Sequence, residues 1–119
     1  MEYRNDPVFV MTEVVNESDL YYDTSSKKLD YMAPVYFENE FRQMFRRWLE
    51  ERNESFDWER CDLYCTDDLM IRFKLDATKA YYRQIYDHLH SIGVKIPITG
   101  TNWTRTPAGL AKAHEDLDF

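Results

Sequence analysis

The sequence predicts an α/β fold built on parallel strands, and three observations lead to that prediction. The run from Val8 to Val15 is rich in β-branched residues and apolar on both alternating faces, as in a strand that is covered on both sides. Two long segments with helical spacing follow it, and a second strand-like run, Val94 to Thr101, comes directly after them. Parallel strands need a crossover connection, usually helical, so this order specifies a parallel sheet.

A long polar loop is expected after the first strand. It extends from Ser18 to Pro34 and contains Tyr21, Tyr22 and Tyr31. The usual connection between a strand and a helix is shorter. Because such length is typical of binding loops, we expect this segment to contact a ligand.

Two amphipathic helices are expected next. The first covers Val35 to about Arg52, with apolar residues at helical spacing that we expect to pack against a sheet. The segment 53–62 is a polar connector with no regular form assigned. The second helix covers about Asp67 to Ser91, and Gly93 is placed to end it as a left-handed cap. The stripe of the first helix consists of Phe37, Phe41, Met44, Phe45, Trp48 and Leu49.

The C-terminal region supplies the second strand and a short helix. Val94 to Thr101 ends in small polar residues, as strands do before a loop. Thr106-Pro107 provides an N-cap and a first-turn proline for a helix through about Glu115. Residues 116–119 look like the opening of a further strand. The expected order is therefore β-α-α-β-α-(β), within one domain over residues 1–119.

Two or three parallel strands would leave unpaired edges and exposed apolar surface if they stood alone. On physical grounds we therefore expect an excerpt of a larger sheet, or a chain that completes its sheet with another chain. A full (β/α)8 barrel takes about 250 residues, so this sequence would supply roughly three of its eight units. The predicted fold class is α/β, in the form of a partial (β/α)8 TIM barrel.

Composition excludes several classes of partner. The formal net charge of -7 opposes attraction to phosphate backbones, so neither nucleic acid nor an anionic membrane surface is expected as a partner. No apolar stretch approaches the roughly 18 residues of a membrane span. The first residues lack the apolar region of a signal peptide. Because the chain is expected to be an excerpt, a cytoplasmic and an extracellular location both stay open.

Cysteines and histidines point to no metal or cofactor. Cys61 and Cys65 have no second pair to complete a zinc site, so we expect ordinary thiols. His88 and His90 lie two apart on a predicted helix and therefore face different sides. His114 stands alone. All three histidines are expected to be solvated residues on helices.

The candidate catalytic residue lies at the end of the first strand, which closes with Asn16-Glu17. Catalytic residues of barrel enzymes sit at the C-terminal ends of the strands. Period-two alternation puts Glu13 and Glu17 on one face, with Glu13 one layer beneath. A carboxylate that is partly desolvated in such a place can act as a general acid near neutral pH.

These residues resemble a known family. Asp6 to Leu20 looks like the fourth barrel strand of retaining glycoside hydrolases related to family 5 and its clan, the cellulase and mannanase relatives. That strand ends in an Asn-Glu pair, so the resemblance implies that Glu17 is the acid/base and that Asn16 contacts the sugar 2-hydroxyl. The run Ile92 to Trp103 is similar to the fifth strand, where substrate contacts follow the Thr-Gly-Thr turn, and residues 116–119 would begin the sixth.

The sequence also departs from the pattern of that family. Ser18 stands where the family often has a second Asn. The nucleophile of the family, a Glu at the end of the seventh strand, has no counterpart here. Retaining hydrolysis needs two carboxylates about 5 Å apart, so the isolated chain is expected to be inactive.

The predicted function is therefore a segment of a retaining glycoside hydrolase that acts on the O-glycosidic bonds of poly- or oligosaccharides. Asn102 is expected to bind the substrate, and Trp103, Tyr21 and Tyr22 could stack on sugar rings or equally serve packing. The expected partners are a carbohydrate and the remainder of the barrel or a second copy of the chain. The alternative is a non-catalytic α/β module, carbohydrate-binding or protein-interacting, that pairs its sheet edges with a partner while Glu17 is merely solvated.

Three tripeptides fit the N-glycosylation pattern, beginning at Asn16, Asn53 and Asn102. Two of them fall at the strand ends that are expected to form the active site. Because a bulky glycan would block that site, we interpret the matches as coincidental.

Overall fold

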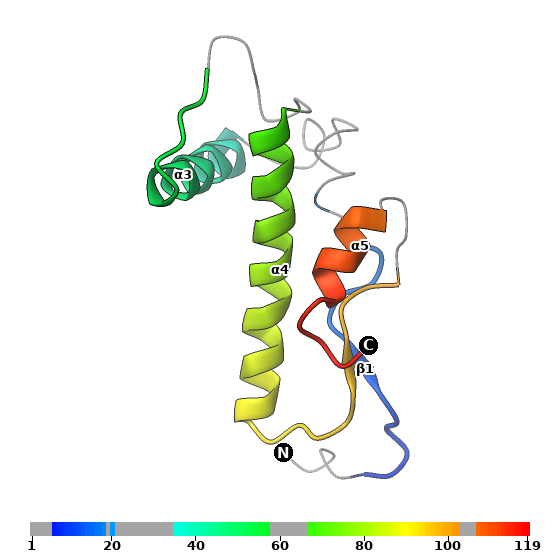
Figure 1. Ribbon diagram of the computed structural model, residues 1–119. Helices are drawn as coiled ribbons and strands as arrows, with labels where there is room; N and C mark the ends of the chain where they lie inside the picture. Colours follow the sequence, from blue (N-terminus) through cyan, green and yellow to red (C-terminus); the bar gives the residue numbers. More distant parts are fainter. Residues whose placement is uncertain (1–5, 19, 21–34, 58–66, 103–106) are drawn as a thin grey trace. The chain divides into compact units, whose positions relative to one another are not determined.

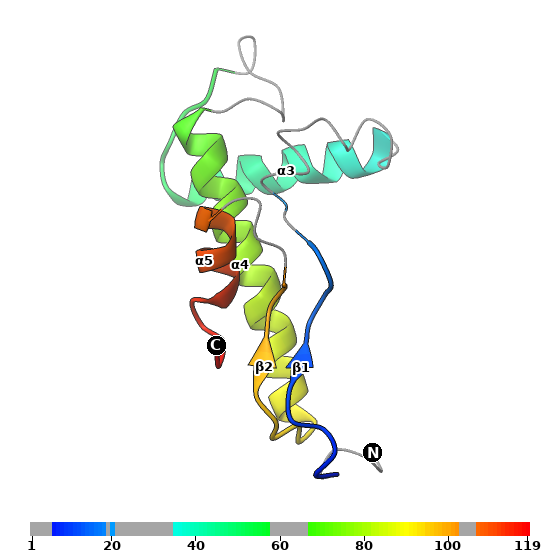
Figure 2. The same cartoon turned by 90° about the vertical axis from the view of Figure 1, so that its right-hand side faces the viewer.

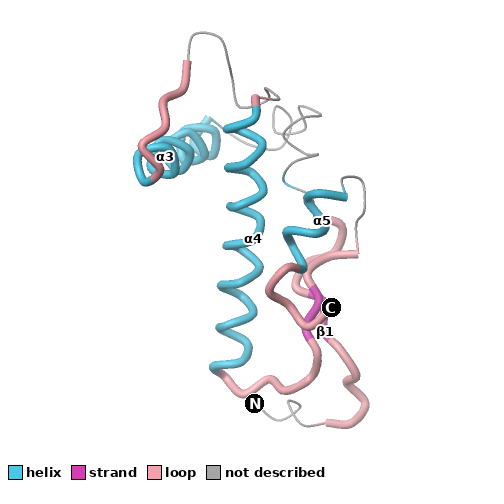
Figure 3. The backbone as a smooth tube through the Cα atoms, in the orientation of Figure 1, coloured by secondary structure: helices cyan, strands magenta, loops and turns pink. Residues whose placement is uncertain are grey.

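The computed structural model describes residues 6–18, 20, 35–57, 67–102 and 107–119. It contains helices and a small two-stranded parallel sheet, an α/β arrangement at the coarse level (Figure 1, Figure 3). The elements are β1 (Thr12–Glu13), α3 (Val35–Glu51), α4 (Asp68–Ser91), β2 (Ile98–Thr99) and α5 (Pro107–His114). The chain divides into two compact units, which are described separately: unit 1 is Met1–Asp19 with Leu75–Phe119, and unit 2 is Leu20–Lys74.

The sheet of unit 1 joins the two ends of the sequence. Thr12 is in register with Ile98 and Glu13 with Thr99, and the strands run parallel, as the sequence predicts (Figure 2). Backbone hydrogen bonds continue the ladder beyond the assigned strands. The amide of Thr12 donates to Pro97 O at 2.9 Å, and those of Val14 and Val15 donate to Thr99 O and Gly100 O at 3.0 and 3.1 Å.

Both strands are shorter than the sequence predicts. The expected strand Val8 to Val15 is reduced to Thr12–Glu13, and Val94 to Thr101 to Ile98–Thr99. Ile98 is fully buried, but Val8 is 79% and Val10 74% exposed. The expectation that the first strand is covered on both faces is therefore wrong for Val8 to Met11 within the described structure. A strand is defined by its ladder partners, and among the described residues the ladder partners of the 12–15 backbone are residues 97–100.

The expected strand at residues 116–119 does not form, but this segment is bound to β2. The amide of Asp118 donates to Ile98 O at 3.2 Å, and the amide of Ile98 donates to Asp118 Oδ2 at 2.8 Å. Asp118 therefore satisfies both backbone groups of Ile98. β2 is thus held by β1 through Pro97 and Thr99, and by the C-terminal segment through Ile98.

α4 begins and ends where the sequence predicts. Asp67 caps its N-terminus, since Asp67 Oδ1 accepts from the amide of Leu69 at 2.8 Å. Gly93 follows its C-terminus with φ 89°. The Gly93 amide donates to His90 O at 2.9 Å and the Val94 amide to Leu89 O at 3.0 Å, which is the Schellman motif.

α5 packs closely on the end of the second strand run. A Cβ placed on Gly100 would lie 3.2 Å from Ala113 O and 3.2 Å from a methyl group of Leu117. A side chain at this position would therefore have to push the C-terminal end of α5 away. Glycine lets the two backbones approach, and Ala113 is correspondingly buried.

Unit 2 is built around the aromatic residues of α3. Phe45 is fully buried, and its ring centroid lies 5.0 Å from that of Phe73 and 4.9 Å from that of Phe56. The stripe was expected to pack on a sheet, whereas these partners lie on the start of α4 and on the connector. Phe37 and Met44, two members of the expected stripe, are exposed. The helix period alone identifies a face but not its partner.

Candidate functional site

The candidate site begins where the β1 ladder ends. After Val15 the chain turns, and Glu17 has φ 50°, in the left-handed region. A non-glycine residue in this region carries a conformational cost and needs support from its surroundings. Asn16 and Glu17 are therefore turn residues directly after the strand, rather than its last two extended positions.

Support for this turn comes from residues 101 and 102, more than eighty positions away in sequence. The amide of Glu17 donates to Asn102 Oδ1 at 3.1 Å, and Asn102 Nδ2 donates to Asn16 Oδ1 at 3.1 Å. The amide of Ser18 donates to Thr101 Oγ1 at 3.1 Å. The structure thus brings Asn16, Glu17 and Asn102 together at the C-terminal ends of the two parallel strands.

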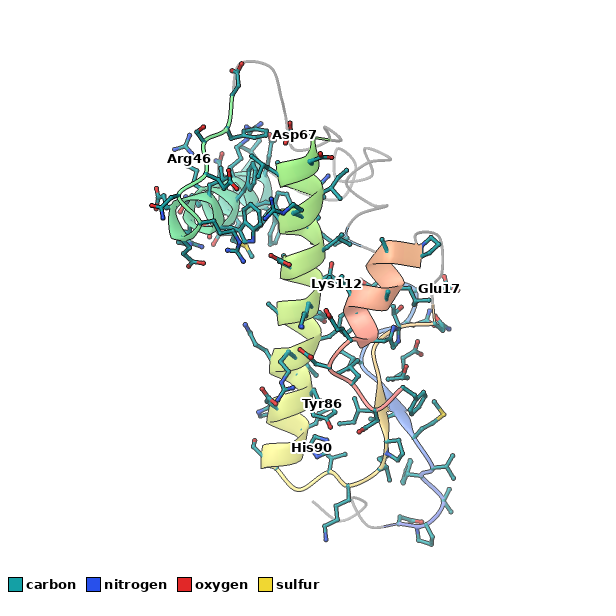
Figure 4. The ribbon with its side chains drawn as sticks, in the orientation of Figure 1. Glu17, Arg46, Asp67, Tyr86, His90 and Lys112 are labelled. Atoms are coloured by element: carbon teal, nitrogen blue, oxygen red, sulfur yellow. The ribbon has the colours of Figure 1, made fainter. Side chains whose placement is uncertain are left out.

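The turn changes the expected relation between Glu13 and Glu17. Period-two alternation requires extended backbone throughout, and the positive φ of Glu17 interrupts it. Both glutamates have exposed side chains. The expected layering of Glu13 beneath Glu17 is therefore not formed, and the described residues do not desolvate the Glu17 carboxylate. Figure 4 shows Glu17 at the periphery of unit 1.

The other three predicted substrate-binding residues are aromatic. Trp103, Tyr21 and Tyr22 lie outside the described residues. Of the predicted binding residues, the structure therefore places Asn16 and Asn102, and it places them in contact with each other. Their pairing orients both amides at the strand ends.

His114 is a residue of this site that sequence reasoning missed. It was expected to be a solvated helix histidine, but its side chain is half-buried at the end of α5. Its Nε2 lies 3.1 Å from Thr99 Oγ1 and 3.3 Å from the amide nitrogen of Thr101. A lone histidine carries no spacing signal, so only the folding of α5 onto the strand end could show this contact.

Charged groups attach the C-terminal segment to α4. Lys79 Nζ lies 3.2 Å from Glu115 Oε2 and 3.2 Å from Asp116 Oδ2, and Lys112 Nζ donates to Glu115 Oε2 at 2.8 Å. Hydrogen bonds to Glu115 and Asp116 raise the pKa of Lys79, and hydrogen bonds from Lys112 and Lys79 lower the pKa of Glu115. These pairs are solvent-exposed, so each one stabilises the fold only weakly.

A second contact attaches α4 to the edge of β2. The phenol of Tyr86 donates to Asp118 Oδ1 at 3.2 Å, while Asp118 Oδ2 accepts from the amide of Ile98. Partial burial, and then the hydrogen bond to Asp118, raise the pKa of Tyr86. Figure 4 shows Tyr86 one turn away from His90 on α4, and the two rings are 4.3 Å apart. Asp118 thus joins α4 to the sheet beneath the candidate site.

Neither metal ligation nor membrane insertion is indicated by the described part of the chain. Within residues 6–18, 20, 35–57, 67–102 and 107–119, no three His, Cys, Asp or Glu side chains gather closely enough to hold a metal ion. Among the helices in the same ranges, none combines the length and apolarity that crossing a bilayer requires.

The chain was compared with family models, curated proteins and solved structures. No family model matches the chain, and no curated protein and no solved structure matches it either.

Proposed function

We propose that this chain is a segment of a retaining glycoside hydrolase barrel in which Glu17 is the general acid/base. The observation that carries the proposal is the meeting of Asn16, Glu17 and Asn102 at the C-terminal ends of two parallel strands. In barrel enzymes the reacting groups are drawn from that end of the sheet. The segment Asp6 to Leu20 resembles the fourth strand of the family-5-like enzymes, and this resemblance is the reason for proposing their reaction.

In the proposed reaction Glu17 acts twice. It protonates the leaving oxygen as the glycosidic bond breaks, and then removes a proton from the water that hydrolyses the glycosyl-enzyme. An exposed carboxylate at a strand end is open to a substrate that approaches from outside the sheet. The second carboxylate, the nucleophile, is expected from a later strand of the barrel, about 5 Å from Glu17 in the assembled site.

Asn16 and Asn102 have complementary roles in this proposal. Asn102 Nδ2 donates to Asn16 Oδ1, so the carbonyl side of the Asn16 amide is engaged within the protein. The NH2 side of Asn16 is then the side that would donate to the sugar 2-hydroxyl. Asn102 also accepts from the amide of Glu17, so one side chain binds the backbone of Glu17 and the side chain of Asn16.

The proposal is tested by Glu17→Ala in the complete protein, with Glu13→Ala as a matched control. Glu13 is an exposed glutamate four positions earlier on β1. With an activated leaving group the first step of the Glu17→Ala variant should survive and the glycosyl-enzyme should accumulate, whereas with a poor leaving group the first step should fail. Azide should restore turnover of the activated substrate, because this nucleophile needs no general base. Glu13→Ala should show neither effect.

An equal loss on both substrates without azide rescue would assign Glu17 a binding or structural role. Rescue of Glu13→Ala by azide would equally contradict the assignment of Glu17. In either case the acid/base proposal is abandoned.

The second candidate function is a non-catalytic module that pairs its sheet edge with a partner. It is favoured by the exposed apolar run Val8 to Met11, in which every side chain is at least 47% exposed. The amides of Val8 and Phe9 are bound to Asp6, so Val10 and Met11, directly before β1, are the part of the run that can accept a further strand. Under this reading Glu17→Ala leaves function intact, while Val10→Lys weakens association in sedimentation experiments.

A further inference from the structure

The hydrogen-bond partners of the His114 ring assign a donor role to one ring nitrogen and an acceptor role to the other. Its Nδ1 lies 2.8 Å from the carbonyl oxygen of Leu110, which can only accept a hydrogen bond, so Nδ1 carries the proton. In the neutral ring Nε2 then has a lone pair. It accepts from the amide of Thr101 at 3.3 Å and from the hydroxyl of Thr99 at 3.1 Å. His114 is thus an acceptor for the backbone of the second strand run.

The next link in this chain of hydrogen bonds reaches the candidate site. Thr101, whose amide is held by His114, is 4% exposed and accepts from the amide of Ser18 through Oγ1. Asn102, the next residue, accepts from the amide of Glu17. The two amides of the Glu17 turn are therefore bound by two consecutive residues, the first of which is fixed by the imidazole.

Close packing fixes the ring against the strand end. A Cβ on Gly100 would lie 3.3 Å from His114 Nε2 and 3.2 Å from Ala113 O. The ring consequently lies against the backbone that it binds. Movement of α5 would move the acceptor of the Thr101 amide with it.

We infer that His114 is a positioning residue for Glu17, which holds Thr101 through Nε2 and, through Thr101, the turn at residues 16–18. The acid/base role of Glu17 rests on the proposed function. The hydrogen-bonded coupling of His114 to the turn at residues 16–18 does not depend on that function. Its chemical requirement is a single acceptor at the place of Nε2, which a glutamine side chain can supply and an asparagine or leucine side chain cannot.

The test uses amide hydrogen exchange of the 119-residue chain with His114→Gln, His114→Asn and His114→Leu. The matched control is His88→Leu, at an exposed position on α4. The amides of Gly93 and Val94 report whether the fold is retained. In the Asn and Leu variants the amides of Glu17 and Ser18 should exchange about fivefold faster, the factor expected for one net hydrogen bond. The Gln variant and the control should keep the original rates.

Unchanged exchange at Glu17 and Ser18 in His114→Leu would overturn the inference, as would equal exchange in the Gln and Asn variants. If His114→Leu also accelerates amide exchange at Gly93 and Val94, that variant has lost part of its fold. The comparison of His114→Gln with His114→Asn then decides whether the coupling exists, because both side chains are polar and differ in length. Failure of azide rescue in Glu17→Ala together with a retained Gln/Asn difference would remove the catalytic role of Glu17 while leaving the coupling in place.

Discussion

Substitution of Gly93 by alanine should destabilise unit 1 through the backbone alone. Gly93 ends α4 with φ 89°, and its amide and that of Val94 close the Schellman motif on His90 O and Leu89 O. Alanine at this position must either adopt the left-handed conformation or abandon both hydrogen bonds. The first choice strains the new residue, and the second frees two carbonyls at the end of a 24-residue helix.

The magnitude follows from the cost of the left-handed conformation. For an L-residue with a Cβ this cost is about 1–2 kcal/mol, and Asn pays less than Ala because its side chain bonds locally. The unsubstituted protein should therefore be the most stable of the three, Gly93→Asn should be less stable, and Gly93→Ala should be the least stable. A loss of 1 kcal/mol lowers the melting temperature by about 4 °C in a chain of this size.

Thermal unfolding followed by far-ultraviolet circular dichroism measures the difference, and amide exchange at Gly93 and Val94 locates it. The turn after α3 gives an internal comparison, because Asn53 has φ 54° and its amide bonds Glu50 O in the same way. Asn53→Gly should be neutral or slightly stabilising. Equal melting temperatures for Gly93, Gly93→Asn and Gly93→Ala would refute the reasoning.

Two further predictions concern packing and charge. Phe45→Ala should destabilise unit 2 by about 3–5 kcal/mol, because the fully buried ring contacts Phe56 and Phe73; a loss below 1 kcal/mol in urea unfolding would contradict this. The pKa of Glu115 is lowered by hydrogen bonds from Lys112 and Lys79, so its contribution to stability is present above the unfolded-state pKa and is lost as the pH falls through the folded-state pKa. Glu115→Gln should therefore lose less stability on acidification, and parallel pH profiles for the two proteins would disprove it.

Several elements could be predicted because their signals are local. Asp67 and Gly93 mark the ends of α4 by capping chemistry, and Pro107 marks the start of α5 by its fixed φ. The parallel pairing of the two strand runs also follows from the order of elements, since a helical crossover joins them. These features depend on residues close to one another in sequence or on connection rules.

The extent of β1 could not be predicted, because a strand is defined by its hydrogen-bond partners. The apolar pattern of Val8 to Val15 indicates burial, yet the described partners begin at Thr12. The same limit applies to the aromatic stripe of α3. Its period identifies Phe45 as a core residue, but its contact with Phe73 depends on how the next helix folds back.

For the candidate site, the sequence by itself determined that Asn16 and Glu17 lie at the end of the first strand run and that Asn102 follows the second. The tertiary structure decided how they meet: Glu17 turns into the left-handed region, and Asn102 binds both Asn16 and the Glu17 amide. It also decided the role of His114, which reaches Thr99 and Thr101 from a separate helix. The physical reason is that a hydrogen bond between residues far apart in sequence leaves no periodic trace, because it requires only that one donor atom and one acceptor atom approach within about 3 Å.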